Sequence, residues 1–273
     1  TYLCLEGSSS NASLALTIDG VVPFEQAEDL NIPRFWKNND EKRIDDTGNE
    51  YAPSQIEADE FAKLRVYDET GVETEPFKFF LTAGVHEIKI SLLEESCYFS
   101  AIKFVAPTVL EDYKDIVKQY KDNGYKNSDK LITIHAENAD LKSKNSLVPK
   151  SDTSSVEVYP ASASNSLLNY IGGPNWSDAG DTLTWCIKVE KAGLYKLDYR
   201  YSQSEVTNGY VYRSLKIDGE IPFKEAGDMA FSYTTGWSVD EFCDDNGNPY
   251  LIWLDEGEHD ISLTVTLGKM SDY

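Results

Sequence analysis

Apolar and polar residues alternate along much of the chain, which is the pattern of strands with one buried face. In the first half this alternation predicts strands over 1–7, 14–18, 77–81, 86–93 and 98–105. In the second half it predicts strands over 183–189, 194–201, 250–254 and 259–267. Turn signals rich in Asp, Asn and Gly separate these runs. Many short strands with regular turns are typical of an all-β sandwich or barrel.

Residues 108–124 break the alternation and have the pattern of a helix. Apolar side chains recur there at helical spacing, at Leu110, Tyr113, Val117 and Tyr120. Thr108 with Glu111 has the spacing of a capping box, and Asn123-Gly124 is a helix stop signal. We expect a short helix that joins two modules and packs through its apolar stripe.

Two stretches of the chain are similar in sequence, Ala15–Asp29 (ALTIDGVVPFEQAED) and Ser214–Asp228 (SLKIDGEIPFKEAGD). Each copy places Asp-Gly between apolar runs, which predicts a two-residue hairpin turn because Gly adopts positive φ without steric cost. A repeat of this kind indicates two related modules. We therefore expect this hairpin to fix strand register in both modules, and we look for ligand groups elsewhere.

The repeat extends beyond the hairpin and sets the expected module boundaries. Leu81–Ile88 aligns with Leu254–Ile261, Asp68–Gly71 with Asp244–Gly247, and Trp36 with Trp237. The first copy has an extra stretch at about 40–65 and no counterpart of 131–193. We predict a first β-sandwich module over 1–107, a helical linker over 108–128 and a second module over 129–273. The first module is either truncated or smaller by design; truncation would leave an unpaired edge and an exposed core, so the missing strands are expected in the parent protein.

Composition narrows the class of partner. The chain has 273 residues with 47 acidic and 25 basic side chains, a net charge of −22. That field repels phosphate backbones and anionic membranes, so we expect no nucleic-acid partner and no direct membrane insertion. The cysteines have no zinc-site spacing and are expected as small core residues, with Cys4 and Cys97 the pair to check.

The sequence carries no recognisable catalytic motif, so we do not expect an enzyme. A glycosidase would need two facing carboxylates in a cleft, and the many acidic residues make chance pairs unavoidable. His86, His135 and His259 are not arranged for a Ser/His/Asp system. His86 and His259 occupy equivalent repeat positions ahead of a strand, which indicates a structural role.

Several motifs of the second module follow one another in a family-like order and spacing. They are Ala136-Glu137, Ile171-Gly172-Gly173 with Trp176, Leu183-Thr184-Trp185, Ala192–Leu197, Ile217-Asp218-Gly219, and Leu254 with Gly257, His259 and Ile261. In these motifs the module resembles carbohydrate-binding modules of families 6 and 35, galactose-binding-like β-sandwiches of jelly-roll type. The tandem modules with a helix between them also resemble N-terminal regions of large extracellular solute-binding proteins of Gram-positive bacteria. These resemblances imply two antiparallel sandwiches, a bacterial extracellular or cell-surface location, and further domains in the same polypeptide.

Sugar binding needs flat aromatic faces for C–H groups and a few polar groups for hydroxyls. The candidates in loops and at strand ends of the second module are Trp176, Trp237, Tyr201, Arg213, Asn169, Asn175 and Asn208. Trp185 alternates with apolar residues and is expected in the core. Trp176 and Trp237 are either sugar platforms or anchors for their loops.

The resemblance also implies a structural Ca²⁺, because the glutamate of the opening Ala-Glu pair helps to hold calcium in those families. Here that residue is Glu137, and Asp140, with Asp152 as a further candidate, could supply more of the roughly six to eight oxygens that Ca²⁺ takes. The alternative is a solvated carboxylate at a strand edge. Asp244–Asn248 is acidic too, but its spacing predicts a turn.

Two functions follow as hypotheses. The first is non-catalytic binding of an oligo- or polysaccharide by modules of a larger extracellular protein. The alternative is a structural spacer that positions a solute-binding domain of an ABC transporter and binds no sugar itself. Burial of Trp176 and Trp237 without a nearby polar pocket would favour the spacer.

Overall fold

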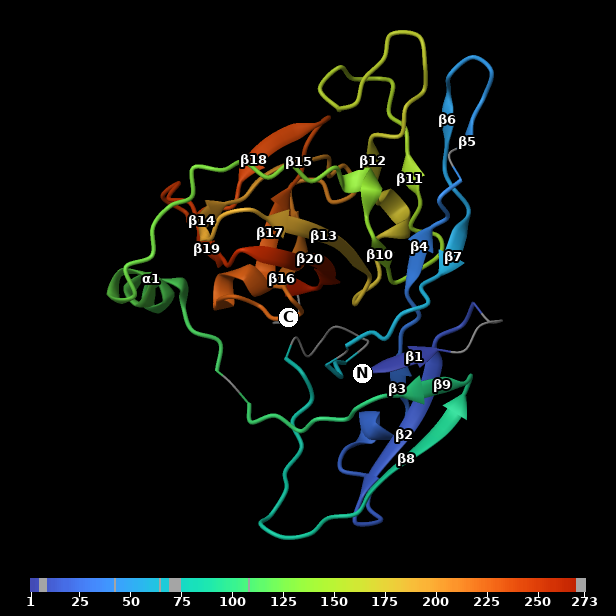
Figure 1. Cartoon of the computed structure of the whole chain (residues 1–273), viewed down its shortest axis with the longest axis vertical. Helices are drawn as coiled ribbons and strands as arrows, with labels where there is room; N and C mark the ends of the chain where they lie inside the picture. Colours follow the sequence, from blue (N-terminus) through green and yellow to red (C-terminus); the bar gives the residue numbers. More distant parts are fainter. Residues whose placement is uncertain (5–8, 42, 64, 69–74, 108, 269–273) are drawn as a thin grey trace.

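The computed structural model describes residues 1–4, 9–41, 43–63, 65–68, 75–107 and 109–268. Strands dominate these residues, and the one α-helix among them connects the two parts of the chain in sequence (Figure 1). The predicted all-β class with one joining helix is confirmed. None of the helices in the described ranges is long and apolar enough to cross a membrane.

The largest sheet has seven antiparallel strands and includes residues from both parts of the chain. Its order is β17 (Met229–Ser232), β16 (Tyr210–Ile217), β20 (Gly257–Thr266), β13 (Thr182–Val189), β10 (Leu141–Lys142), β4 (Trp36–Asn38) and β7 (Gln55–Glu57). The last two strands come from the first module, through the Trp36–Lys142 pairing. Residues 36–57 thus extend the sheet of the second module, a connection that the repeat does not predict.

Three two-stranded ladders belong to the same part of the chain as this sheet. They are β14 (Gly193–Lys196) with β19 (Leu251–Leu254), β15 (Asp198–Tyr201) with β18 (Ser238–Glu241), and β11 (Pro149–Lys150) with β12 (Tyr170–Ile171). The main core packs Ile187, Leu215 and Ile261 of the large sheet with Ile252 and Leu254 of β19. Side chains of two layers therefore meet in one core, as in a β-sandwich. Trp185 is 7% exposed and lies in the core, as predicted.

The first module is smaller. Its sheet has the order β3 (Leu30–Ile32), β2 (Ala12–Ile18) and β8 (Ile88–Glu94), and a second ladder pairs β1 (Tyr2–Cys4) with β9 (Cys97–Phe99). A hairpin of β5 (Arg43–Ile44) and β6 (Glu50–Tyr51) extends from it beside the loop that joins β11 to β12 (Figure 1). Cys4 and Cys97 are register partners on β1 and β9, and both are free thiols.

The repeated stretch forms the same structure in both modules. Asp19-Gly20 and Asp218-Gly219 all have positive φ, between 53° and 83°, and the flanking residues Ile18 and Val21 exchange two backbone hydrogen bonds of 2.9 and 3.0 Å. Single 3₁₀ turns follow, η1 (Glu25–Glu28) and η4 (Lys224–Asp228). The predicted two-residue turn is confirmed in both copies.

The repeat also shows which strands the first module lacks. The order β3-β2-β8 matches β17-β16-β20 in the same register, since Ile18 pairs with Ile88 as Ile217 pairs with Ile261. β20 continues to β13, whereas β8 has β2 as its only partner among the described strands. Leu92 on β8 is consequently 44% exposed, and its counterpart Val265 only 6%.

Three element predictions need correction. The helix α1 spans Tyr113–Asp122 with Asp112 at its N-cap, so Glu111 is not in a capping box and instead accepts a hydrogen bond from Gln119. Thr108 lies outside the described residues.

Residues 77–81 form no strand, because their counterpart β19 pairs with β14 and no residues of this sequence align with β14 in the first module. The strand predicted over 98–105 is limited to β9. The apolar stripe of α1 does pack on the main core through Tyr113 and Ile116.

The counterpart of Asp244–Asn248 is Asp45–Asn49, and the predicted alignment with Asp68–Gly71 is corrected. In both turns the first Asp N–H donates to the last Asn carbonyl, at 3.0 and 2.9 Å, and Asp Oδ1 accepts two backbone N–H groups. The extra stretch of the first module therefore follows Tyr51. Residues 69–74 lie outside the described part of the chain.

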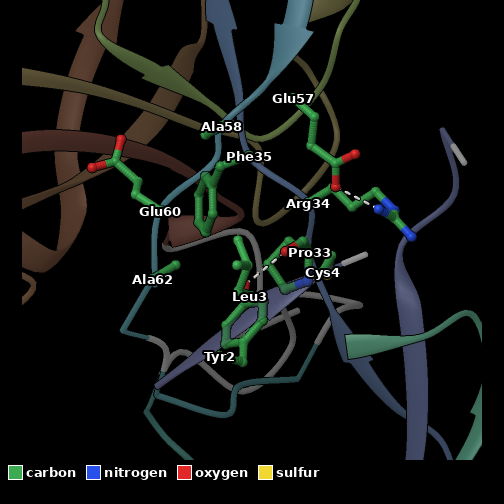
Figure 2. Close-up of a pocket in the computed structure, with 10 residues that line it drawn as sticks. All are labelled: Tyr2, Leu3, Cys4, Pro33, Arg34, Phe35, Glu57, Ala58, Glu60 and Ala62. Carbon is green, nitrogen blue, oxygen red and sulfur yellow. Dashed lines mark hydrogen bonds and ion pairs between the residues drawn. The ribbon is translucent and has the colours of Figure 1, made fainter. Parts of the chain in front are cut away.

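Buried charge fixes the point where the first module leads into the large sheet. Arg34 is fully buried between β3 and β4 and pairs with Glu57 (Figure 2). It also pairs with Glu95 at 3.3 Å. Next to it, the Tyr2 hydroxyl donates to the Pro33 carbonyl at 2.6 Å. A buried guanidinium is tolerable only with such partners. Further along, Lys216 lies 4.4 Å from the ring centre of Tyr67, and Arg65 pairs with Glu220.

Candidate ligand-binding site

Strand register brings the predicted binding residues to one end of the second module. β16 and β13 begin where β20 ends, through the pairs Tyr212–Thr266 and Thr182–Thr264. β15 ends where β18 begins, through Tyr201–Ser238. The Asp218-Gly219 turn lies at the other end of β16. The repeated hairpin and the non-repeated loops are therefore at opposite ends of the module.

A cavity of about 230 Å³ lies within the loop that joins β11 to β12. Hydroxyl, amide and carboxyl groups share its lining with aliphatic side chains. The principal lining residues are Asp152, Thr153, Ser155, Ser162, Leu167 and Asn169. Two of the predicted sugar-binding residues converge on this loop, Asn169 in the cavity lining and Trp237 through its bond to Asp152.

The Asn169 side chain hydrogen-bonds to other residues of the cavity loop. Its side chain is 6% exposed; Oδ1 accepts from the Asp152 N–H at 2.9 Å, and Nδ2 donates to the carbonyls of Asp152 and Pro160 at 3.0 and 2.9 Å. These three bonds use most of the capacity of one amide group. Asn169 therefore sets the loop conformation and contributes to the cavity wall.

Asp152 links the cavity to Trp237. One carboxylate oxygen accepts from Ser154 N and Oγ at 2.7 and 2.6 Å, and the other accepts from Trp237 Nε1 at 2.7 Å. Hydrogen bonds from Ser154 and Trp237 hold the pKa of Asp152 below its ordinary value. The half-buried Trp237 ring also packs edge-on against Tyr170, with 5.6 Å between ring centres.

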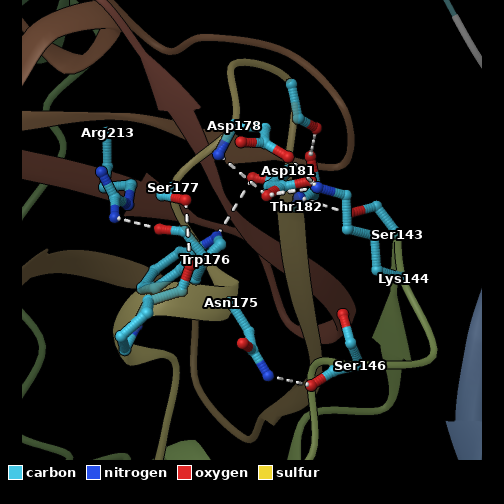
Figure 3. Close-up of polar contacts among 12 residues, drawn as sticks. Ser143, Lys144, Ser146, Asn175, Trp176, Ser177, Asp178, Asp181, Thr182 and Arg213 are labelled. Carbon is cyan, nitrogen blue, oxygen red and sulfur yellow. Dashed lines mark hydrogen bonds and ion pairs between the residues drawn. The ribbon is translucent and has the colours of Figure 1, made fainter.

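Trp176 and Arg213 do not line the cavity; their side chains contact each other (Figure 3). The Arg213 guanidinium lies 4.3 Å from the Trp176 ring centre and donates to its carbonyl at 2.9 Å, while Trp176 Nε1 donates to the Asp181 carbonyl at 3.1 Å. A Cβ built on Gly172 would come within 3.1 Å of the same ring. Burial lowers the pKa of Arg213 to about 10. These contacts favour the loop-anchor interpretation of Trp176.

The other three candidates lie apart from the cavity. Asn175 is exposed and donates to the Ser146 carbonyl at 2.9 Å. Tyr201 packs on the core against Phe231, and its hydroxyl lies 2.9 Å from that of Ser232. Asn208 is exposed with a positive φ of 59°. Their roles in binding remain predictions.

Glu137 and Asp140, the predicted calcium ligands, each have a partner of their own. Glu137 is buried, with His135 3.6 Å away, and burial raises the pKa of its carboxyl. The Asp140 carboxylate accepts the Cys186 N–H at 2.7 Å. No group of three or more His, Cys, Asp or Glu residues able to hold a metal occurs within the described ranges. Calcium also takes backbone and amide oxygens, so its binding here stays a prediction.

Sequence reasoning missed the contribution of the first module to this site. Thr47, Asn49 and Glu50 of the β5–β6 hairpin contact residues 165–168 of the cavity loop. A contact between distant segments has no local sequence signal. Asp152 did have one, because Asp followed by Thr-Ser-Ser is typical of an Asx turn.

Comparison with known proteins gives partial matches to solved structures. No family model and no curated protein matches the sequence. Solved structures that match include a family 35 carbohydrate binding module from Clostridium thermocellum, at 21% identity and a TM-score of 0.28, over 36% of this chain and 65% of that one. Others are a GH26-CBM35 β-(1,4)-mannanase of Podospora anserina (17%, TM-score 0.34, 50% and 24%) and a cycloisomaltooligosaccharide glucanotransferase of Paenibacillus sp. (19%, TM-score 0.35, 57% and 21%). The matched parts span less than two thirds of each of these structures. Similarities of this size carry no information on the ligand, which is inferred below from the contacts of the site.

Proposed function

We propose that the protein binds carbohydrate without catalysis and that the cavity between β11 and β12 holds the sugar. The observation that carries this proposal is the cavity itself, a hollow of about 230 Å³ lined by both hydroxyl and aliphatic groups. A sugar ring presents the same mixture, with hydroxyls around its edge and C–H groups on its faces. Trp237 and Tyr170 lie beside the loop and add aromatic surface.

The size of the cavity suits one sugar unit. Pockets for drug-sized ligands usually measure roughly 300–1,000 Å³, and this one is smaller. An oligo- or polysaccharide would thus insert a single residue and leave the rest in solvent. A contact of this extent supports affinities of about mM to μM.

The electrostatics favour a neutral sugar. The hydroxyls of Thr153, Ser155 and Ser162 can both donate and accept. The residues that line the cavity include no Lys or Arg to attract an acidic sugar, and the Asp152 carboxylate, which accepts from Ser154 and Trp237, would repel one. With a net charge of −22, the chain as a whole repels anionic glycans. By resemblance, we place the protein on a bacterial surface as part of a larger polypeptide.

Isothermal titration of the full chain against neutral and acidic oligosaccharides, with Ca²⁺ and with EDTA, tests the proposal. We expect at least one neutral sugar to bind in the mM to μM range, and Asn169→Ala to abolish that binding. Asn175→Ala, which removes an amide bonded outside the cavity, is the matched control. Absence of binding across plant, bacterial and host glycans would reject the proposal.

The spacer function is supported by a separate observation. The Trp36–Lys142 pairing places strands of both modules in one sheet, which suits a rigid connector. A pure spacer would have both loop tryptophans buried and no polar pocket beside them. Trp176 and Trp237 are half-buried, but a cavity lies beside the Trp237–Asp152 bond, so only part of this condition is met. The spacer function would be favoured if none of the tested glycans bound and both modules unfolded in a single transition.

A further inference from the structure

We infer that the β5–β6 hairpin of the first module positions the cavity wall of the second, so that the ligand site is shared between modules. This inference rests on the proposed function only for the identity of the ligand. The hairpin comes from residues 43–51, and the wall from residues 165–169, more than a hundred positions later.

Four hydrogen bonds join the hairpin to the wall. The Glu50 N–H donates to the Ser166 carbonyl at 2.8 Å, and the Ser166 N–H donates to Asn49 Oδ1 at 2.9 Å. The Leu168 N–H donates to Glu50 Oε2 at 2.9 Å, and Asn165 Nδ2 donates to the Thr47 carbonyl at 2.5 Å. Three of them use backbone groups of the wall, one as a backbone-to-backbone bond and two through the side chains of Asn49 and Glu50, so the hairpin holds the main chain of the wall.

The wall segment divides its two sides between hairpin and cavity. Leu167 and Asn169 line the cavity, whereas the backbone groups held by the hairpin belong to Ser166 and Leu168; Asn165 lines the cavity and also bonds to the hairpin through its side chain. This alternation is that of an extended chain. A displacement of the hairpin would therefore displace the lining side chains with it.

The hairpin is itself rigid enough to act as a support. Asp45 Oδ1 accepts from the N–H groups of Thr47 and Asn49 at 2.9 Å each, and Asn49 Nδ2 donates to Asp45 Oδ2 at 3.0 Å. Gly48, with φ of 90°, lies so close that an added Cβ would come within 2.8 Å of Asn165 Nδ2. The Asp244–Asn248 turn repeats the internal bonds, but Asn248 has no counterpart of the Asn49–Ser166 bond among the described residues. It is a natural control.

Hydrogen exchange of the full chain, read by mass spectrometry, tests the inference without a ligand. We expect Asn49→Ala/Glu50→Ala to raise exchange over 150–169 at least tenfold and to leave β13, β16 and β20 unchanged. Asn248→Ala should leave 150–169 unchanged. Glu50→Gln keeps an acceptor for the Leu168 N–H and should restore protection relative to Glu50→Ala. Equal exchange over 150–169 in these two variants would show that the Glu50 side chain does not hold the wall.

The second arm titrates the same variants with xylohexaose, mannohexaose, cellohexaose and isomaltohexaose. We expect about a tenfold loss of affinity in the double variant for whichever probe binds the unmodified chain. The reason is that the hydrogen bonds lost from the hairpin together correspond to a free-energy change of about that size. Unchanged exchange over 150–169 in the double variant overturns the inference. Faster exchange with no probe bound by any variant overturns the proposed function and leaves the positioning role standing. If the double variant unfolds, Glu50→Ala against Glu50→Gln gives the same two readouts.

Discussion

The Asp218 carboxylate lies 2.7 Å from Nδ1 of His259 and also accepts the Asp260 N–H at 2.9 Å. Asp19 makes the same two contacts in the first module, with His86 at 2.7 Å and the Glu87 N–H at 2.8 Å. The other ring nitrogen faces a backbone carbonyl, that of Asp255 at 3.0 Å or Thr82 at 2.8 Å. Both nitrogens of each imidazole thus face acceptors, and only the protonated ring can donate to both. This clasp connects the repeated hairpin to the strand that pairs with it.

The clasp predicts a stability that falls as pH rises. Partial burial lowers the pKa of His259, but the hydrogen bonds to Asp218 and to the Asp255 carbonyl outweigh it, and the net pKa is raised. The hydrogen bond to Asp19 raises the pKa of His86 as well. A raised pKa means that the stabilisation is complete below about pH 6.5, the ordinary value, and is lost as pH passes the raised value.

Urea unfolding of the full chain between about pH 5.5 and 9 measures this effect, with pH 6.5 as the reference point. We expect the unfolding free energy to decline more steeply in the unmodified chain than in His259→Gln, and His259→Gln to cost about 1–2 kcal/mol at the acid end. His135→Gln is the control, because His135 is not part of a clasp. Parallel pH profiles for the unmodified chain and His259→Gln would contradict the assignment.

Asn169→Ala is expected to destabilise the cavity loop by about 1–3 kcal/mol, because it leaves buried groups of Asp152 and Pro160 without their partner. The measurement is the midpoint of thermal unfolding, together with proteolysis of the loop. Asn175→Ala removes one exposed bond and should change neither. Equal stability of the two variants would show that the Asn169 network does not hold the loop.

What the sequence could predict is limited by the range of the interactions involved. The Asp-Gly turns and the stop of α1 at Asn123-Gly124 depend on local backbone chemistry, and both appear as predicted. Residues 77–81 have the same local pattern as β19, yet they form no strand because a strand needs a partner. Local alternation cannot report whether that partner exists.

The repeat held one signal that would have corrected the alignment. The motif D-D-x-G-N occurs at 45–49 and at 244–248, and Asp244 follows Asp45 by the same number of residues as Asp218 follows Asp19.

The candidate site is harder to predict from the sequence. Residue type and position in loops or at strand ends selected Trp176 and Arg213 as separate sugar-binding groups, but their contact with each other joins segments 37 positions apart and has no local signal. The hairpin contact with the cavity depends on the sheet shared by both modules.

The two loop tryptophans should respond differently to the same substitution. Trp237→Phe removes the donor to Asp152 beside the cavity, and we expect about a tenfold loss of affinity for a neutral oligosaccharide that binds the unmodified chain. Trp176→Phe removes the bond to the Asp181 carbonyl and weakens the packing of Arg213, so we expect lower stability and unchanged affinity. Calorimetric titration and thermal unfolding of both variants separate these outcomes. An affinity loss confined to Trp176→Phe would move the ligand site to the Arg213 side.

Lys142 provides a test of the sheet shared between the modules. Its side chain is fully buried where β10 meets β4, and burial lowers its pKa to about 8. A lowered pKa for a lysine means that folding carries the cost of a buried charge at neutral pH, and that stability rises as pH increases through about 8.

We therefore expect Lys142→Met to stabilise the protein by about 1 kcal/mol at pH 7 and to remove the rise in stability above pH 8. Asn38, which accepts from Lys142 Nζ at 2.5 Å, keeps its second donor, Gln55 Nε2 at 2.9 Å, so no buried acceptor is left without a partner. Lys188→Met, at a charged position on β13 that is exposed, is the matched control and should have little effect. Denaturant unfolding at pH 7 and pH 9.5 gives both values. A loss of stability in Lys142→Met of more than about 2 kcal/mol would show that the Lys142–Asn38 bond contributes more to the joint between the modules than burial of the charge costs.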